Sequence, residues 1–132
     1  MRACPTAICG TFLAMFGSGC SSLSGKWMGS CDYGDARYGY TSAITVQMED
    51  GTGSEVAGDV NLDMFDGRSF KGRVKGLRSD TYLEMDGTFR QDDGEWQFTI
   101  SGDIGEDIIE GDCGLVVPLG AGSLSGELTL ER

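Results

Sequence analysis

Apolar and polar residues alternate along most of this chain, with a period of two that begins near residue 25. Such alternation is typical of β-strands that bury one face and leave the other in water. The pairs Asp50-Gly51 and Asp66-Gly67 interrupt it, since Asp-Gly supplies the positive φ that tight hairpins need. The pattern predicts eight short strands, at about residues 25–32, 40–49, 54–64, 68–77, 83–89, 96–104, 108–117 and 123–131.

A glycine recurs on the apolar face of most of these strands, at Gly29, Gly58, Gly72, Gly87, Gly102, Gly111 and Gly126. Glycine weakens a strand interior, so we expect a compensating use. Inward glycines let strands bend sharply and let a neighbouring aromatic ring lie over the backbone, which suits a crowded small barrel. We therefore predict an all-β fold, a small antiparallel up-and-down meander that closes into a roughly eight-stranded barrel. A two-sheet β-sandwich is the alternative.

Residues 1–19 differ from the rest of the chain. Arg2 comes first, an apolar run from Ala7 to Phe16 follows, and small residues end the segment. This order is typical of a secretory signal peptide. The run is too short for a membrane-spanning helix, which takes about 20 apolar residues. The alternative is an N-terminal helix or strand that is buried in the fold.

The sequence FGSGC at residues 16–20 resembles the lipobox of bacterial lipoproteins. The resemblance implies that residues 1–19 are a lipoprotein signal peptide and that Cys20 is diacylated and becomes an acylated N-terminus. Two or more acyl chains hold a protein firmly at a membrane. By the same resemblance, Ser21 implies export to the outer membrane. Gly17 departs from the usual aliphatic residue, so cleavage by an ordinary signal peptidase is the alternative.

The remainder of this 132-residue chain is long enough for one domain. Residues 20–25 are expected to form a flexible tether, and residues 26–132 the β-barrel domain. Cys31 and Cys113 would be the cysteines of that domain, and in an exported protein an even pair predicts a disulfide bond. Closing a loop of roughly 80 residues would stabilise the fold by about 4 kcal/mol. Two separate buried thiols are the alternative.

The charge of the chain excludes several kinds of partner. A formal net charge of -11 argues against nucleic acid, which needs basic contacts, and against docking on anionic lipid. The sequence contains no histidine, no nucleophile elbow and no phosphate-binding loop, so we expect no enzyme activity and no cofactor. No metal site is predicted either. The oxygen-rich groups have no EF-hand spacing and are expected to be solvated, at Asp32/Asp35, Asp103/Glu106/Asp107 and Glu110/Asp112.

The opening stretch from Leu23 to Trp27 resembles the first strand of avidin-type and lipocalin-type barrels. In those barrels a Gly-x-Trp sequence plugs one end, so the resemblance implies that Trp27 is a core plug. The other strand motifs of avidins are not found in this chain, and no biotin-binding residue is carried over.

The large inward side chains are expected to fill the barrel rather than to line a cavity, although the inward glycines leave room. The loop from residue 33 to residue 40 is the candidate interaction loop, because tyrosine and arginine favour interfaces: Tyr33, Arg37, Tyr38 and Tyr40. The same loop could instead pack on the rim of the barrel. The sequence thus predicts a lipid-anchored, non-enzymatic structural or protein-interaction module of the bacterial cell envelope. The alternative is a lipocalin-like protein that binds a small apolar ligand.

Overall fold

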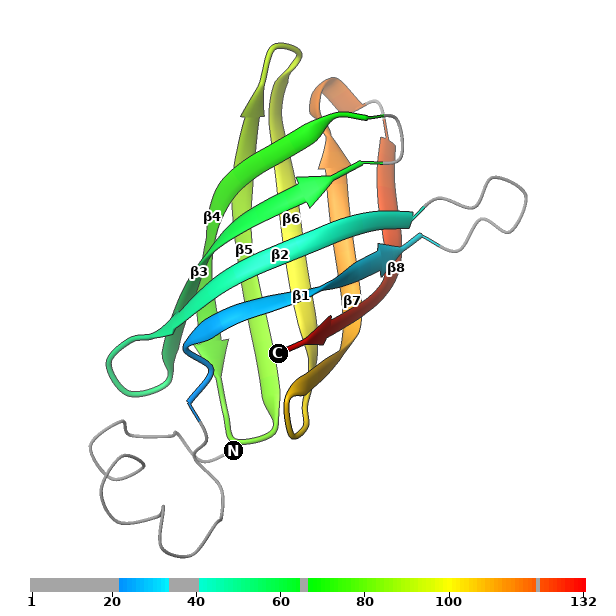
Figure 1. Cartoon of the computed structure of the whole chain (residues 1–132). Coiled ribbons are helices and arrows are strands. Elements are labelled where there is room, and N and C mark those ends of the chain that lie inside the picture. Colours follow the sequence, from blue (N-terminus) through cyan, green and yellow to red (C-terminus); the bar gives the residue numbers. More distant parts are fainter. Residues whose placement is uncertain (1–21, 34–40, 65–66, 121) are drawn as a thin grey trace, which may run out of the picture.

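The computed structural model describes residues 22–33, 41–64, 67–120 and 122–132. They form a closed antiparallel barrel (Figure 1). Its elements are β1 (Gly25–Asp32), β2 (Thr41–Asp50), β3 (Glu55–Asp63), β4 (Ser69–Arg78), β5 (Tyr82–Gln91), β6 (Gly94–Ile104), β7 (Ile108–Val117), the short 3₁₀ turn η2 (Pro118–Gly120) and β8 (Gly122–Glu131).

Each strand pairs with the next one along the chain, and β8 pairs back with β1. The predicted eight-stranded meander is therefore confirmed, with strand ends that agree to within one or two residues. The sandwich alternative is wrong, because the β1–β8 ladder closes the sheet on itself. No helix among the described residues has the length and apolar character needed to cross a membrane.

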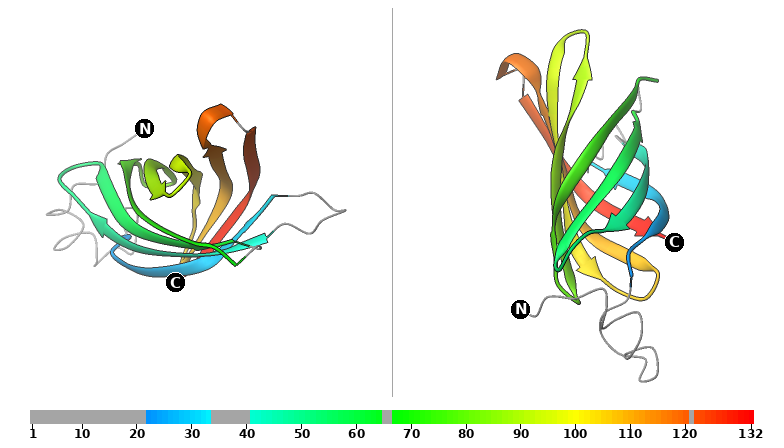
Figure 2. Two further views of the ribbon diagram at one scale, coloured as in Figure 1. Left: turned by 90° about the horizontal axis from the view of Figure 1, so that it is seen from above. Right: turned by 90° about the vertical axis from the view of Figure 1, so that its left-hand side faces the viewer.

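The two ends of the barrel differ. In Figure 1, β1 to β4 cross the front and β5 to β7 lie behind them, and Figure 2 shows the same curled sheet from above and from the side. The β2–β3, β4–β5 and β6–β7 turns lie at one end, which we call the closed end. The β5–β6 and β7–β8 connections lie at the other end, the rim. The β1–β8 ladder has only five residue pairs, against seven to ten in the other ladders, so β8 extends beyond β1 toward the rim.

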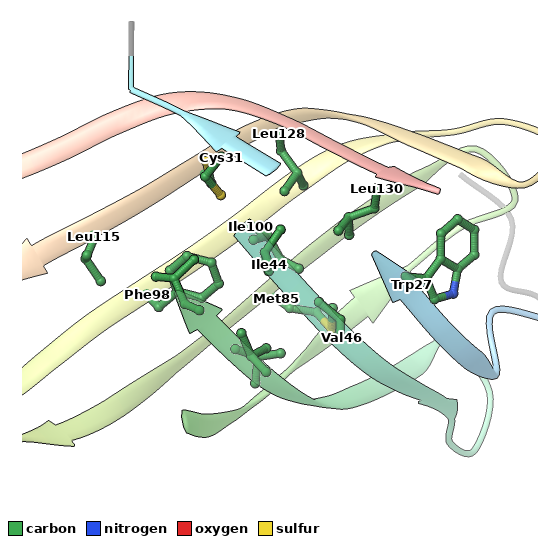
Figure 3. Packing of buried hydrophobic residues seen from close by; sticks show 14 of the residues in the cluster. Trp27, Cys31, Ile44, Val46, Met85, Phe98, Ile100, Leu115, Leu128 and Leu130 are labelled. Atoms are coloured by element: carbon green, nitrogen blue, oxygen red, sulfur yellow. The ribbon is translucent and has the colours of Figure 1, made fainter. Parts of the chain in front are cut away.

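The interior is occupied by one apolar cluster to which every strand contributes. Figure 3 shows Trp27 at one end of this cluster and Phe98 and Leu115 in the half away from it. Water-accessible area is 0–1% for the rings of Trp27, Phe70, Phe89 and Phe98. A ring beside a cavity that admits water would keep accessible area, so the space around these rings is filled, as predicted.

The inward glycines mark places where neighbouring backbones come very close. A Cβ atom on Gly76 would lie 1.9 Å from the Glu84 carbonyl oxygen, and one on Gly111 would lie 2.0 Å from the Ser101 carbonyl oxygen. At Gly72, the ring of Phe89 covers the backbone, since a Cβ there would lie 2.6 Å from Cδ1 of that ring. Tight bending and an aromatic ring over glycine both agree with the sequence prediction.

Trp27 plugs the closed end, as the sequence predicts. Its indole is fully buried, and Nε1 donates a hydrogen bond to the Leu23 carbonyl at 2.8 Å. The Arg132 guanidinium lies over the Trp27 ring, 4.5 Å from the ring centre. Nη1 of Arg132 also donates to the Ser22 carbonyl at 2.7 Å. The two chain segments at residues 22 and 132 are thus joined at the closed end.

Residues 22–24 differ from the predicted flexible tether. Leu23 is buried, and its backbone N–H donates to the Asp50 carboxylate at 2.9 Å. The Ser22 hydroxyl donates to the same carboxylate at 2.8 Å. Asp50 in turn forms an ion pair at 3.2 Å with Arg78, whose side chain is only 2% exposed. A buried leucine and a buried ion pair fix these residues to the barrel, so the fold begins before residue 25.

Candidate functional site

The rim half of the interior carries an aromatic wall formed by β4, β5 and β6. The ring centres of Phe70 and Trp96 are 4.8 Å apart, and those of Phe89 and Phe98 are 5.3 Å apart. Phe70 also contacts Phe89, with 5.7 Å between the ring centres. These tilted contacts are typical of stabilising aromatic pairs. The alternation places all four rings on the inner face, because each strand sends every second side chain inward.

Arg68 covers the outer edge of this wall. Its guanidinium lies 5.0 Å from the centre of the Trp96 ring and 5.3 Å from that of Phe70. Asp93 connects the same groups, because its carboxylate accepts a hydrogen bond from Trp96 Nε1 at 2.8 Å and lies 3.8 Å from the Arg68 guanidinium. The β5–β6 turn and the start of β4 are thereby held together at the rim.

A polar group of side chains lies on the opposite part of the barrel wall. Tyr33, which directly follows β1, is 8% exposed and belongs to the apolar cluster. Its hydroxyl is buried and has no hydrogen-bond partner in the part of the chain that the structure describes. Ser42 on β2 is fully buried, and its hydroxyl donates to Met64 Sδ at 3.4 Å. A thioether is a weak acceptor, so both hydroxyls lack a strong partner.

These two hydroxyls are neighbours. Ser42 is close enough to Tyr33 to influence the pKa of the phenol, although the contact does not meet hydrogen-bond geometry. Burial is the main effect, and it raises the pKa of Tyr33 above its ordinary range. The phenol therefore stays protonated at physiological pH and presents an O–H donor to the interior.

Cys31 and Cys113 complete the polar wall. Cys31 lies opposite Ser42 in the β1–β2 ladder, and Cys113 lies opposite Gly126 in the β7–β8 ladder. Both are buried free thiols in this structure. The neighbouring Cys113 thiol and burial raise the pKa of the Cys31 thiol. The side chains are therefore neighbours across β8, and the disulfide bond stays a prediction.

The barrel order sets the two walls against each other. β1 and β2 lie four strands away from β5 and β6 in a closed ring of eight. Cys31 and the two hydroxyls, at β1 and β2, therefore lie across the interior from the rings on β5 and β6, whereas Cys113 on β7 lies beside β6. Aliphatic side chains, by contrast, fill the core nearer the closed end, where Figure 3 shows Val46, Met85 and Leu130.

Three open hollows lie on the outer surface of the described strands. One has a volume of about 590 Å³ and lies over β2 to β5, next to the exposed Leu77. Charged side chains line it, and Arg73 there pairs with Glu49 and Asp59. Two further hollows of about 390 and 450 Å³ lie over β4 to β6 and β6 to β8. Their charges are paired or solvated, so none resembles a built site.

Of the four residues of the predicted interaction loop, Tyr33 lies within the described residues. It is buried against the apolar cluster. Arg37, Tyr38 and Tyr40 lie outside the described residues, as does the predicted lipidation site Cys20. Within the described ranges, no three side chains of His, Cys, Asp or Glu gather in a way that could hold a metal ion.

The sequence analysis did not identify Ser42 or Arg78 as inward-facing residues. Both continue the alternation of their strands, Ser42 before Ile44 and Arg78 after Gly76. The phase of the alternation could have placed them inside, but a serine or an arginine gives no sign by its residue type that it faces inward. Arg68 had no sequence signal, because its contacts depend on how β4 and β6 meet.

No family model and no curated protein matches this chain. One solved structure, EF1p2_mFAP2b bound to DFHBI, is similar over 83% of this chain and 93% of its own, with a TM-score of 0.66. The chain shares the fold of that β-barrel. At 16% sequence identity the likeness concerns the fold alone, so it transfers no residue role.

Proposed function

We propose that this protein is a lipid-anchored, non-enzymatic β-barrel of the bacterial cell envelope that acts through its rim. The observation that carries the proposal is the fixing of residues 22–24 at the closed end by Asp50 and Arg132. Acyl chains on Cys20 would lie two residues from this point. The closed end would then face the outer membrane, and the rim would point away from it.

The charge of the barrel supports this orientation. Residues 94–131, which include β6, β7 and β8, contain no lysine or arginine. A surface of this kind is repelled by anionic lipid and does not bind nucleic acid. Anchoring therefore depends on the acyl chains, and the strands stay clear of the membrane surface.

An exposed leucine at the rim supports a role in protein interaction. Leu119 in η2 has a φ of 62°, a left-handed conformation that is unfavourable for a residue with a side chain. Its side chain is 97% exposed. Strained residues that persist often serve a function, and this strain holds an apolar side chain outward at the rim. A protein partner that contacts the rim is therefore the first candidate.

A small molecule is the second candidate for the rim. The unpartnered Tyr33 hydroxyl and the facing aromatic wall favour it. The similar barrel EF1p2_mFAP2b was solved bound to DFHBI, which supports the capacity of such a fold to hold a small ligand. The filled interior favours a protein partner over a small molecule, because a bound ligand would need space that side chains now occupy.

Intact-mass spectrometry of the protein extracted from bacterial membranes tests the anchor. We expect a chain that lacks residues 1–19 and carries the added mass of acyl chains at Cys20. The matched variant Cys20→Ala should lose the acyl mass and leave the membrane fraction. An unacylated wild-type chain in the soluble fraction, with residues 1–19 retained, would contradict the proposal.

A further inference from the structure

We propose that the rim half of the barrel interior binds small, neutral, flat aromatic molecules that carry an oxygen acceptor, with the Tyr33 and Ser42 hydroxyls donating to that oxygen. This inference deepens the small-molecule candidate above. It does not depend on the lipid anchor, which is tested by a separate measurement.

The first argument is the state of the two hydroxyls. A buried hydroxyl without a partner costs about 1–3 kcal/mol, so native structures rarely keep one without a reason. Here Tyr33 Oη has no partner among the described residues, and Ser42 Oγ has only the Met64 sulfur at 3.4 Å. An oxygen acceptor between them would satisfy both groups at once.

The second argument concerns the charge of the ligand. Burial keeps Tyr33 in its neutral form, and the raised pKa of Cys31 keeps that thiol neutral as well. The polar wall thus presents uncharged donors. The arginines that adjoin the interior are already paired, Arg78 with Asp50 at the closed end and Arg68 with Asp93 at the rim. The charge of a carboxylate or sulfonate would therefore compete with these carboxylates, so a neutral carbonyl fits better.

The third argument concerns shape and space. The rings of Phe89, Phe98 and Trp96 lie on β5 and β6, across the interior from these hydroxyls, and Phe70 on β4 contacts Phe89 and Trp96. Tilted ring contacts of this kind favour a flat aromatic ligand. Met64, whose sulfur accepts from Ser42, is the most adaptable side chain of this group, with three rotatable bonds. Its movement would make room for the ligand and would replace a weak sulfur acceptor by an oxygen.

The test is a fluorescence titration of the protein with prodan, a neutral naphthyl ketone whose emission shifts when its carbonyl is hydrogen-bonded. We expect saturable binding of prodan and much weaker binding of the anionic dye 1-anilinonaphthalene-8-sulfonate. Tyr33→Phe should weaken prodan binding roughly tenfold, the effect of one buried hydrogen bond, and shift the bound emission to the blue. Tyr82→Phe, on the outer face of β5, is the matched control and should change neither value.

Three results would overturn the inference: no saturable prodan binding, equal binding of both dyes, or equal binding by wild type and Tyr33→Phe. Ser42→Ala provides a second variant if Tyr33→Phe folds poorly, and it should weaken binding in the same direction. A circular dichroism spectrum and the free energy of unfolding of each variant show whether it is folded. None of these outcomes affects the mass measurement that tests the anchor, so the two proposals can fail separately.

Discussion

The Arg132 guanidinium lies over the Trp27 indole, 4.5 Å from its ring centre. This contact connects the residue that follows β8 to β1. The same guanidinium contacts the Ser22 carbonyl and the Asp107 carboxylate, the latter at 3.3 Å. One side chain thus joins the β6–β7 turn, β1 and the segment before β1. The closed end depends on this contact because only five residue pairs join β1 to β8.

Replacing Arg132 by alanine should therefore lower the free energy of unfolding by about 1–3 kcal/mol, since a cation–π contact and a charged hydrogen bond are lost together. Urea denaturation followed by tryptophan fluorescence measures the change. Arg90→Ala is the control, because Arg90 has an 87% exposed side chain and only a 3.5 Å ion pair with Glu95. That control should lose less than about 1 kcal/mol. Equal losses in the two variants would show that the Trp27 contact is not important.

Gly111→Ala should destabilise the barrel by more than about 2 kcal/mol, because the new Cβ would collide with the Ser101 carbonyl and the Gly102 backbone. Gly114→Ala, on the same strand, is the matched control. Its Cβ would meet the Thr99 hydroxyl at 2.8 Å, and a side chain can rotate away. Thermal unfolding of both variants measures the difference. Equal losses of stability in Gly111→Ala and Gly114→Ala would contradict the close backbone approach at Gly111.

Leu119→Gly should raise the free energy of unfolding by about 0.5–1 kcal/mol, because glycine adopts a φ of 62° without a steric penalty. Leu119→Ala removes the same side chain but keeps the left-handed backbone, so it should leave stability nearly unchanged. If a rim partner exists, both variants should bind it more weakly. A stabilisation of similar size in the alanine variant would instead attribute the effect to removal of an exposed leucine.

Cys31 and Cys113 should form a disulfide bond when the protein is exported to an oxidising compartment. Intact mass under non-reducing conditions should be lower by two hydrogens than after reduction. Reduction should lower the free energy of unfolding by up to about 4 kcal/mol in the chain-entropy account. Cys113→Ala, measured with and without reductant, is the control and should show no such difference. Two alkylatable thiols in the unfolded, unreduced wild-type protein would contradict the prediction.

The reduced protein should lose stability at alkaline pH. The raised pKa values of Tyr33 and Cys31 mean that the folded chain holds protons which an unfolded thiol releases near pH 8.5 and an unfolded phenol near pH 10. The unfolded state then binds fewer protons, so the free energy of unfolding is steady below about pH 8 and falls above it. Urea titrations from pH 7 to 11 measure this fall. Tyr33→Phe should flatten the part above pH 9.5, whereas Tyr82→Phe should follow the wild type.

The alternation of apolar and polar residues was sufficient to predict the strands and their inward faces. Closure into a barrel was favoured by the inward glycines, because the alternation alone also allows a two-sheet sandwich. The alternation succeeded even at β7, where Ile108 and Ile109 adjoin, because Cys113 and Leu115 fix the phase. The pair Asp50-Gly51 marked the turn between β2 and β3, but the positive φ expected at Gly51 lies at Gly53 instead, with a φ of 65°. Gly67 has the expected positive φ, 91°.

The contacts that distinguish the two ends could not be predicted in this way. Asp50 and Arg78 are 28 positions apart, and each looks like an ordinary surface charge until the curvature of the barrel brings them together. Tyr33 was placed in the loop from residue 33 to residue 40, yet it is buried and continues the inward phase of β1 past Cys31. The curvature of the whole barrel determines these contacts, and the residue pattern of a single strand does not predict it.

The contact between Arg132 and the Ser22 carbonyl at 2.7 Å has a practical consequence for redesign. A short linker could join residues 22 and 132 into a continuous loop, and new ends could then be opened at the β5–β6 turn. Such a circular permutant would keep every ladder of the barrel while presenting its ends beside the aromatic wall. The order in which the strands are synthesised would change, but each strand would pair with the same two neighbours.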